Sequence, residues 1–172
     1  MQIESFIRAI PDYPKPGILF RDITPLLADG EAFRHTINVL AERYRDQGVT
    51  KIVGIEARGF IFATALAYAM GIGFVPLRKP GKLPRKTVSQ TYALEYGEDK
   101  LELHADDITA ADKVVVVDDL LATGGTILAA VEMLKNQQAT IIECAFIITL
   151  ADLPGAQRLQ QAKIPYYTLC SF

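Results

Sequence analysis

The sequence predicts an α/β fold in which a mostly parallel central sheet is flanked by helices. Two stretches support this prediction, because each contains a buried strand, a glycine-bearing turn and an apolar helix in the same order. The first stretch runs from Lys51 to Met70 and the second from Val114 to Gln138. The chain has 172 residues without repeats or linkers, so residues 1–172 are expected to form a single domain.

The secondary structure can be assigned in chain order from hydrophobic spacing. Glu4 to Ile10 has the spacing of a short amphipathic helix that Pro11 would end, and the following prolines favour an extended Ile18 to Asp22. Further helices are expected at about 31–47, with Gly48 as the stop, and at about 59–70, 126–138 and 154–161. Strands are expected at about 51–55, 74–77, 114–118, 139–150 and 165–169, the last at an edge, with an antiparallel pair at about 87–96 and 100–104.

The composition restricts the class of protein. Half of the residues are hydrophobic, 22% are charged and the formal net charge is −2, which excludes a disordered chain and a globally basic nucleic-acid-binding protein. Cys144 and Cys170 lie in apolar surroundings without a CxxC pattern, so both are expected to be reduced core residues. Glu4 and Arg8 fall where a signal peptide would be apolar, so a cytoplasmic location is expected.

One uncharged stretch has the length of a membrane span. Gly59 to Leu77 contains 19 residues without a charge. Gly71, Gly73 and Pro76 divide it, which favours a buried helix ending near Met70 and a short strand over a membrane segment. No membrane partner is therefore expected.

The stretch from Val114 to Thr126, VVVVDDLLATGGT, is the strongest functional motif. Its paired glycines allow the backbone to bend so that successive N–H groups converge at the start of a helix, an arrangement that suits a phosphate. Asp118 and Asp119 would stand at the carboxyl end of the strand, where their charges would repel unless hydroxyls or a metal satisfied them. Such residues can also form an ordinary loop, but the combination favours binding of a phosphorylated sugar. It is not a Walker A loop, because no lysine follows the glycines.

Two basic features could contribute to an anion site. Arg58 follows the strand 51–55 and could bind an anion through a forked pair of hydrogen bonds, or could form a structural ion pair with Glu56 or Asp118. The run RKPGKLPRK at 78–86 is a mobile basic loop that suits a flap over pyrophosphate better than a nucleic-acid patch, since it contains no aromatic residue. His104, a single histidine on a strand beside acidic residues, is interpreted as a surface residue.

Taken together, these motifs resemble the type I phosphoribosyltransferases. VVVVDDLLATGGT is similar to the family's motif for phosphoribosyl pyrophosphate (PRPP), and its LLATGGT part resembles the adenine-specific branch. Three further stretches fit that branch: PKPGILFRDITPLL at 14–27, IEARGF at 55–60 and YALEYG at 92–97. The resemblance covers nearly the whole chain, and it implies a small hood formed by about residues 1–28 and a flexible flap formed by about residues 78–96.

The resemblance implies a reaction and its partners. Adenine and PRPP would give AMP and pyrophosphate, with Mg²⁺ held mainly through PRPP and water rather than by protein ligands. A homodimer is also implied, and nucleic acid is not an expected partner. Two alternatives remain open at this stage: a phosphoribosyltransferase for hypoxanthine, guanine or orotate, and a PRPP-sensing regulator without enzymatic activity.

The resemblance also assigns roles to individual residues. The 5′-phosphate would be anchored by Ala122, Thr123, Gly124, Gly125 and Thr126, and the ribose hydroxyls by Asp118 and Asp119. The purine would meet the backbone of Leu19 and the neighbouring Phe20, with Arg21 beside that pocket, although Arg21 could instead pair with Asp22. Pyrophosphate would be bound by Arg58 and Lys82. The 6-oxopurine branch has an aspartate at the position of Ala122, so the proton carrier here would be Glu95, which could otherwise be an ordinary exposed glutamate on a strand.

Overall fold

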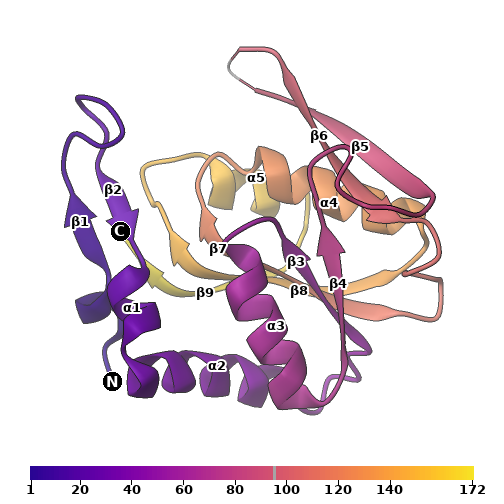
Figure 1. Ribbon diagram of the computed structural model, residues 1–172, viewed down its shortest axis with the longest axis horizontal. Coiled ribbons are helices and arrows are strands. Elements are labelled where there is room, and N and C mark those ends of the chain that lie inside the picture. Colours follow the sequence, from indigo (N-terminus) through magenta and orange to yellow (C-terminus); the bar gives the residue numbers. More distant parts are fainter. Residues whose placement is uncertain (95) are drawn as a thin grey trace.

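The computed structural model describes residues 1–94 and 96–172, and a five-stranded sheet forms its centre (Figure 1). The strands are β3 (Lys51–Ile55), β4 (Gly73–Leu77), β7 (Lys113–Leu121), β8 (Thr140–Thr149) and β9 (Tyr166–Ser171). They lie in the order β4-β3-β7-β8-β9, and every neighbouring pair is parallel. The predicted α/β fold with a mostly parallel sheet is therefore confirmed, and β9 is an edge strand as expected.

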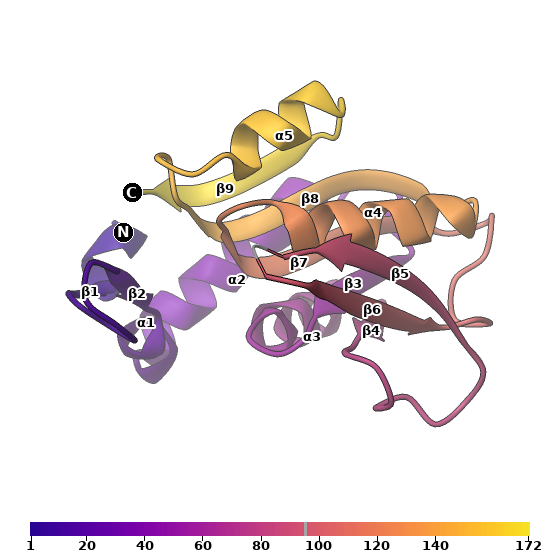
Figure 2. The same ribbon diagram turned by 90° about the horizontal axis from the view of Figure 1, so that it is seen from above.

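Helices cover both faces of the sheet (Figure 2). A 3₁₀ helix η1 (Ile3–Phe6) and the helices α1 (Thr24–Ala28), α2 (Gly30–Tyr44) and α3 (Gly59–Met70) pack on one face. The other face carries α4 (Gly125–Asn136) and α5 (Gly155–Gln161). Val115 and Val117 of β7 pack in the core on the side of α2 and α3, whereas Val114 and Val116 pack in the core on the side of α4 and α5. The run of four valines is thus explained by burial on both faces.

Two antiparallel hairpins stand outside the central sheet. One pairs β1 (Arg8–Ile10) with β2 (Phe20–Asp22), and the other pairs β5 (Thr87–Ala93) with β6 (Glu98–His104). The second hairpin was predicted. The first was not, because Glu4 to Ile10 was expected to be a helix. That prediction holds only as far as Phe6, where the 3₁₀ helix η1 ends. It is wrong for Arg8 to Ile10, because so short a segment gains little as a helix and pairing with β2 satisfies its backbone instead.

Other boundaries differ from expectation for identifiable reasons. β7 does not end at Asp118 but continues to Leu121, because β8 continues to pair with it through Leu121 and Thr149. Helix α2 ends at Tyr44 and is capped at its start by Asp29, whose side chain accepts a hydrogen bond from the Ala32 N–H over 2.8 Å. The short helix α1 was not predicted.

His104 was expected at the surface, and that prediction was wrong. Its side chain is buried, with 7% exposure. The Nδ1 atom of His104 lies 3.0 Å from Arg85 Nη2 and 3.2 Å from Asp107 Oδ2. It thereby fixes the end of the basic loop to β6. No helix within residues 1–94 and 96–172 combines the length and the apolar character that crossing a membrane requires.

Candidate active site

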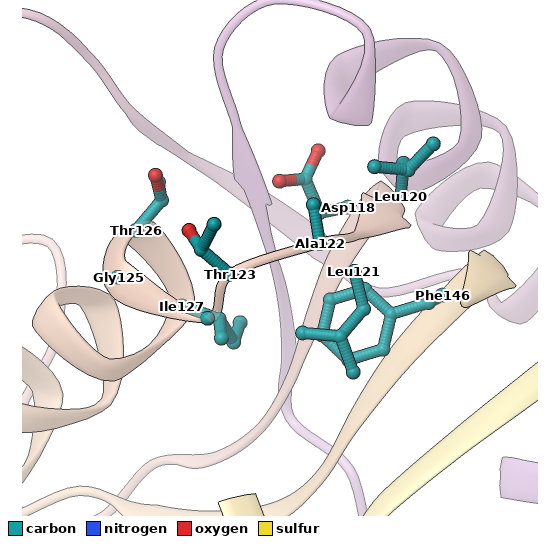
Figure 3. A pocket seen from close by; sticks show the side chains of 10 residues that line it. Asp118, Leu120, Leu121, Ala122, Thr123, Gly125, Thr126, Ile127 and Phe146 are labelled. Carbon is teal, nitrogen blue, oxygen red and sulfur yellow. The ribbon is translucent and has the colours of Figure 1, made fainter. Parts of the chain in front are cut away.

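A tight turn joins β7 to α4 and forms a small cradle. Gly124 precedes the helix with φ of +86°, a conformation that favours glycine. The cradle has a volume of about 90 Å³ and is lined by Asp118, Phe146 and residues 120–127. In Figure 3 the carboxylate of Asp118 and the hydroxyls of Thr123 and Thr126 extend to one side of the turn, with Leu121 and Phe146 on the other.

The cradle has the chemistry of an anion site. The first N–H groups of a helix have no acceptor within the helix, and the helix dipole adds partial positive charge at the same point. Thr123 is exposed, and Gly125 and Thr126 are half-buried, so the turn is open to a ligand. The residues expected to anchor a phosphate, Ala122 to Thr126, are therefore brought together at one helix start.

The two adjacent aspartates are held in a poorly solvated position beside the cradle. Asp119 is 4% exposed, and its Oδ2 atom accepts no hydrogen bond, although Arg58 Nε lies 2.9 Å away. Burial raises the pKa of Asp119, and Arg58 opposes this rise. Burial and the neighbouring Asp119 raise the pKa of Asp118 well above its ordinary value. A hydroxyl group could supply the hydrogen bond that Asp119 Oδ2 lacks.

Arg58 reaches Asp119 because β3 and β7 are neighbours. The turn after β3, in which the Glu56–Ala57 peptide is cis, ends at Arg58, and α3 begins at Gly59. A Cβ at Gly59 would lie 2.9 Å from the Val117 carbonyl oxygen, so only glycine allows α3 to start so close to β7. The structural alternative for Arg58 named Glu56 or Asp118, whereas the observed ion pair is with Asp119.

Glu56 connects this turn to the basic loop. Its carboxylate accepts hydrogen bonds from Arg78 Nη2 over 2.7 Å, from Lys82 Nζ over 2.9 Å and from the Lys79 N–H over 2.9 Å. Although burial opposes the change, the Lys79 N–H, Lys82 and Arg78 lower the pKa of Glu56 to about 2. The predicted pyrophosphate residue Lys82 is thereby held beside the turn that carries Arg58.

A cavity of about 330 Å³ unites these parts. It is lined by Ile55, Glu56, Ala57, Arg58, Lys79, Asp118, Asp119, Leu120 and Thr126. Arg58 and Thr126 thus share one cavity at the carboxyl edge of the sheet, as binding of one phosphorylated sugar by both would require. Within residues 1–94 and 96–172 no group of three or more His, Cys, Asp or Glu side chains could hold a metal ion.

The hairpin β1–β2 brings the predicted purine residues to this edge. The Arg58 guanidinium lies 5.6 Å from the centre of the Phe20 ring, which Tyr13 contacts edge-on. Leu19 beside it is 49% exposed. Arg21 does not form the ion pair with Asp22 that was considered as an alternative. Its guanidinium carbon Cζ instead lies 4.0 Å from the centre of the Phe172 ring. Glu95, the predicted proton carrier, lies outside the described residues.

Sequence reasoning missed the contacts of three residues that support the site: Glu56, Lys79 and Arg158. Glu56 binds residues more than 20 positions away, which no local pattern indicates. Lys79 Nζ contacts the Tyr92 hydroxyl over 2.7 Å and also Asp99, and this joins the loop to the hairpin β5–β6. Arg158 donates to the Thr123 carbonyl oxygen over 2.7 Å. The sequence offered only one indication of this bond, which is that Arg158 follows by one turn the glycine at which a short helix begins.

Known proteins share this architecture. Residues 24–169 match the family model described as phosphoribosyl transferase domain. An adenine phosphoribosyltransferase from Idiomarina loihiensis is 57% identical over 170 residues, which cover 99% of this chain and 96% of that protein. The crystal structure of adenine phosphoribosyltransferase from Thermoanaerobacter pseudethanolicus is similar with a TM-score of 0.93 at 45% identity, covering 99% of this chain and 98% of that one. The Saccharomyces cerevisiae enzyme, complexed with D-2,5-dideoxy-2,5-imino-altritol 1,6-bisphosphate and adenine, has a TM-score of 0.90 at 37% identity and coverage of 97% and 96%.

Proposed function

The chain belongs to the phosphoribosyltransferase family, among the adenine phosphoribosyltransferases, and from this premise we infer that it transfers the phosphoribosyl group of PRPP to adenine. The products are AMP and pyrophosphate. The observation that carries the inference is the cavity in which Thr126 of the phosphate cradle, the aspartate pair and Arg58 meet. The yeast relative was crystallised with a sugar bisphosphate analogue and adenine together, the two kinds of ligand that this reaction requires.

The proposed mechanism starts from the position of the sugar. The N–H groups of Thr123 to Thr126 hold the 5′-phosphate, and Asp118 and Asp119 accept hydrogen bonds from the ribose hydroxyls. Departure of pyrophosphate leaves positive charge at the anomeric carbon, and the two carboxylates favour that charge. Fixing the sugar at both ends also orients this carbon toward the incoming purine nitrogen.

Arg58 and Lys82 neutralise the leaving group. Arg58 lies beside Asp119 and Lys82 beside Glu56, so each cation exchanges a carboxylate for a diphosphate oxygen when PRPP binds. The flap formed by residues 78–96 carries Lys82 toward the diphosphate in this proposal. Mg²⁺ is proposed to arrive on PRPP and to be held mainly by its diphosphate and by water. When bound, Mg²⁺ supplies further charge neutralisation for the diphosphate.

The base site is proposed on the hood formed by residues 1–28. Phe20 provides an aromatic ring near Arg58, Leu19 provides backbone hydrogen bonds to the purine edge, and Arg21 lies beside them. Ala122 cannot carry a proton, so Glu95 is the proposed proton carrier, on the strength of the resemblance at 92–97. Glu95→Gln should slow transfer and leave PRPP affinity nearly intact; lost PRPP affinity would instead assign Glu95 to the donor site.

The direct test is product formation with a panel of bases. Purified protein is given PRPP and either adenine, hypoxanthine, guanine or orotate, with Mg²⁺ or with a chelator, and nucleotide products are separated by chromatography. We expect AMP from adenine, much slower reaction with the other bases and loss of the reaction with the chelator. Faster turnover of another base would assign a different phosphoribosyltransferase.

The same assay tests the regulator alternative. Four cations of the basic loop, Arg78, Lys79, Lys82 and Arg85, are paired with carboxylates. The loop also contains no aromatic residue that could stack on bases, so its charge alone does not favour a nucleic-acid site. Specific nucleic-acid binding without any AMP formation would nevertheless establish the regulator.

A further inference from the structure

Helix α5 forms hydrogen bonds with two backbone carbonyls of the phosphate turn, which is the segment 122–124 between β7 and α4. The Gly155 N–H donates to the Ala122 carbonyl oxygen over 2.9 Å. One turn later, Arg158 Nη1 donates to the Thr123 carbonyl oxygen over 2.7 Å. These are consecutive carbonyls of the turn that precedes α4.

Holding a carbonyl also fixes an N–H group. A peptide unit is planar and trans, so its C=O and N–H bonds point in opposite directions. The Ala122 carbonyl shares a peptide plane with the Thr123 N–H, and the Thr123 carbonyl shares one with the Gly124 N–H. When α5 binds the two carbonyls on one side of the turn, the N–H groups of Thr123 and Gly124 are aimed to the other side.

The contact between α5 and the turn is too close for side chains. A Cβ at Gly155 would overlap the Ala122 carbonyl oxygen and lie 2.8 Å from Leu121 Cδ1. A Cβ at Gly124 would lie 3.1 Å from the Gly155 Cα. The turn and the start of α5 therefore pack backbone against backbone, and a change in α5 is transmitted directly to the turn.

Arg158 itself lies outside the cradle. The cradle is lined by Thr123 to Ile127 among others, whereas Arg158 lines a neighbouring groove with Tyr92, Gly125 and Leu128. Its guanidinium thus acts on the backbone of Thr123 rather than on a ligand in the cradle. It also partly neutralises the negative end of a carbonyl close to the place of a phosphate.

We propose that Arg158 is a positioning residue for the 5′-phosphate of PRPP, because its bond to the Thr123 carbonyl aims the Gly124 N–H into the cradle. This proposal rests on the function proposed above. It assigns to α5 a role in donor affinity rather than in base selection, since the two bonds described above both reach the phosphate turn.

The test compares Arg158→Met, which keeps the aliphatic stem, with Arg158→Lys, which keeps the positive charge. Gln157→Met, an exposed neighbour on the same helix, is the matched control. KM for PRPP, KM for adenine and kcat are measured from AMP formation, and the dissociation constant of ribose 5-phosphate is measured by calorimetry. Thermal melting reports whether the variants fold.

Arg158→Met should raise KM for PRPP and the dissociation constant of ribose 5-phosphate by about tenfold, the effect of losing one charged hydrogen bond. KM for adenine should stay unchanged, Arg158→Lys should recover most of the affinity, and Gln157→Met should behave as wild type. Unchanged affinity for PRPP in Arg158→Met would overturn the proposal, as would equal losses for both substrates. A wild-type protein that forms no AMP, while Arg158→Met still weakens ribose 5-phosphate binding, would overturn only the proposed function.

Discussion

Asp119 is the residue whose environment is hardest to explain by folding alone. Its Oδ2 atom is buried without a hydrogen-bond donor, close to Arg58 and the cradle. A buried acceptor of this kind costs stability, and a ligand hydroxyl in the cavity would supply the donor that Oδ2 lacks. We therefore propose that Asp119 binds the sugar.

Asp119→Asn should lower the rate of AMP formation about a hundredfold, the usual effect of removing one preorganised polar group from an active site. Stability should change little, because the amide fills the same space and carries no buried charge. Rates and melting temperatures are measured together, with Asp106→Asn as a control at an exposed ion pair. An unchanged rate in Asp119→Asn would remove Asp119 from the mechanism.

Glu56 gives the molecule a testable dependence on pH. Its pKa is lowered from 4.5 to about 2 in the folded protein. The unfolded chain therefore binds this proton more readily, so the contribution of Glu56 to stability is present above pH 4.5 and is lost as the pH falls toward 2.

Glu56→Gln should lower the free energy of unfolding at pH 7 by about 1 to 2 kcal/mol, a value discounted because Lys82 is half exposed. The variant should also lose less stability on acidification than the wild type does. Urea unfolding between pH 7 and pH 3 measures both quantities. Parallel stability curves for the two proteins would show that Glu56 is not held by its cationic partners.

Residues of the site differed in how far the sequence could reveal them. Asp118, Asp119 and Arg58 follow apolar strands, and parallel strands bring their carboxyl ends to one edge. The roles of Glu56 and Arg158 depend on contacts with distant segments, so no local pattern contained them. Arg58 lies between these two cases. The sequence predicted its place at the end of a strand, but it did not predict Asp119 as its ion-pair partner.

At the scale of elements, the close approach of α3 to β7 places Arg58 beside the aspartates. Gly59→Ala should lower the free energy of unfolding by about 1 to 3 kcal/mol, since the added methyl group meets the Val117 carbonyl and Asp118. Gly30→Ala is the control, because a Cβ there meets no atom within 4 Å. Equal stability of the two variants, measured by urea unfolding, would contradict the close packing.

Elements were predictable where their sequence pattern matched their final environment. The strand Lys51–Ile55 and the helix ending at Met70 have such patterns, and both were predicted with these bounds. Arg8 to Ile10 is short and could form either a helix or a strand, so the choice was made by its partner Phe20–Asp22. In the same way, the last residues of β7 are strand because β8 pairs with them.

At the scale of the whole molecule, we propose a homodimer formed through the exposed face of α3. This helix has 12 residues without a charge, and its surface presents Ile61 at 38% and Tyr68 at 90% exposure. Subunit interfaces are enriched in tyrosine and depleted of charged residues at their centre, so we place the proposed contact on this face of α3.

Sedimentation analysis should give twice the chain mass of 18.9 kDa for the wild type. Tyr68→Lys should shift the protein toward the monomer, because a charge in an apolar interface is costly. Leu153→Lys, at another exposed apolar residue, should leave the mass unchanged. A monomeric wild type, or a dimer indifferent to Tyr68→Lys, would contradict this interface.

The proposed function depends on the backbone N–H groups of the turn between β7 and α4, which would bind the phosphoryl group of the sugar. The most direct measurement is a titration with ribose 5-phosphate followed by the amide chemical shifts of the assigned protein. We expect the largest shifts at Thr123 to Thr126 and smaller ones at Asp118 and Asp119. Shifts confined to the basic loop at 78–86, with none at the turn, would contradict it.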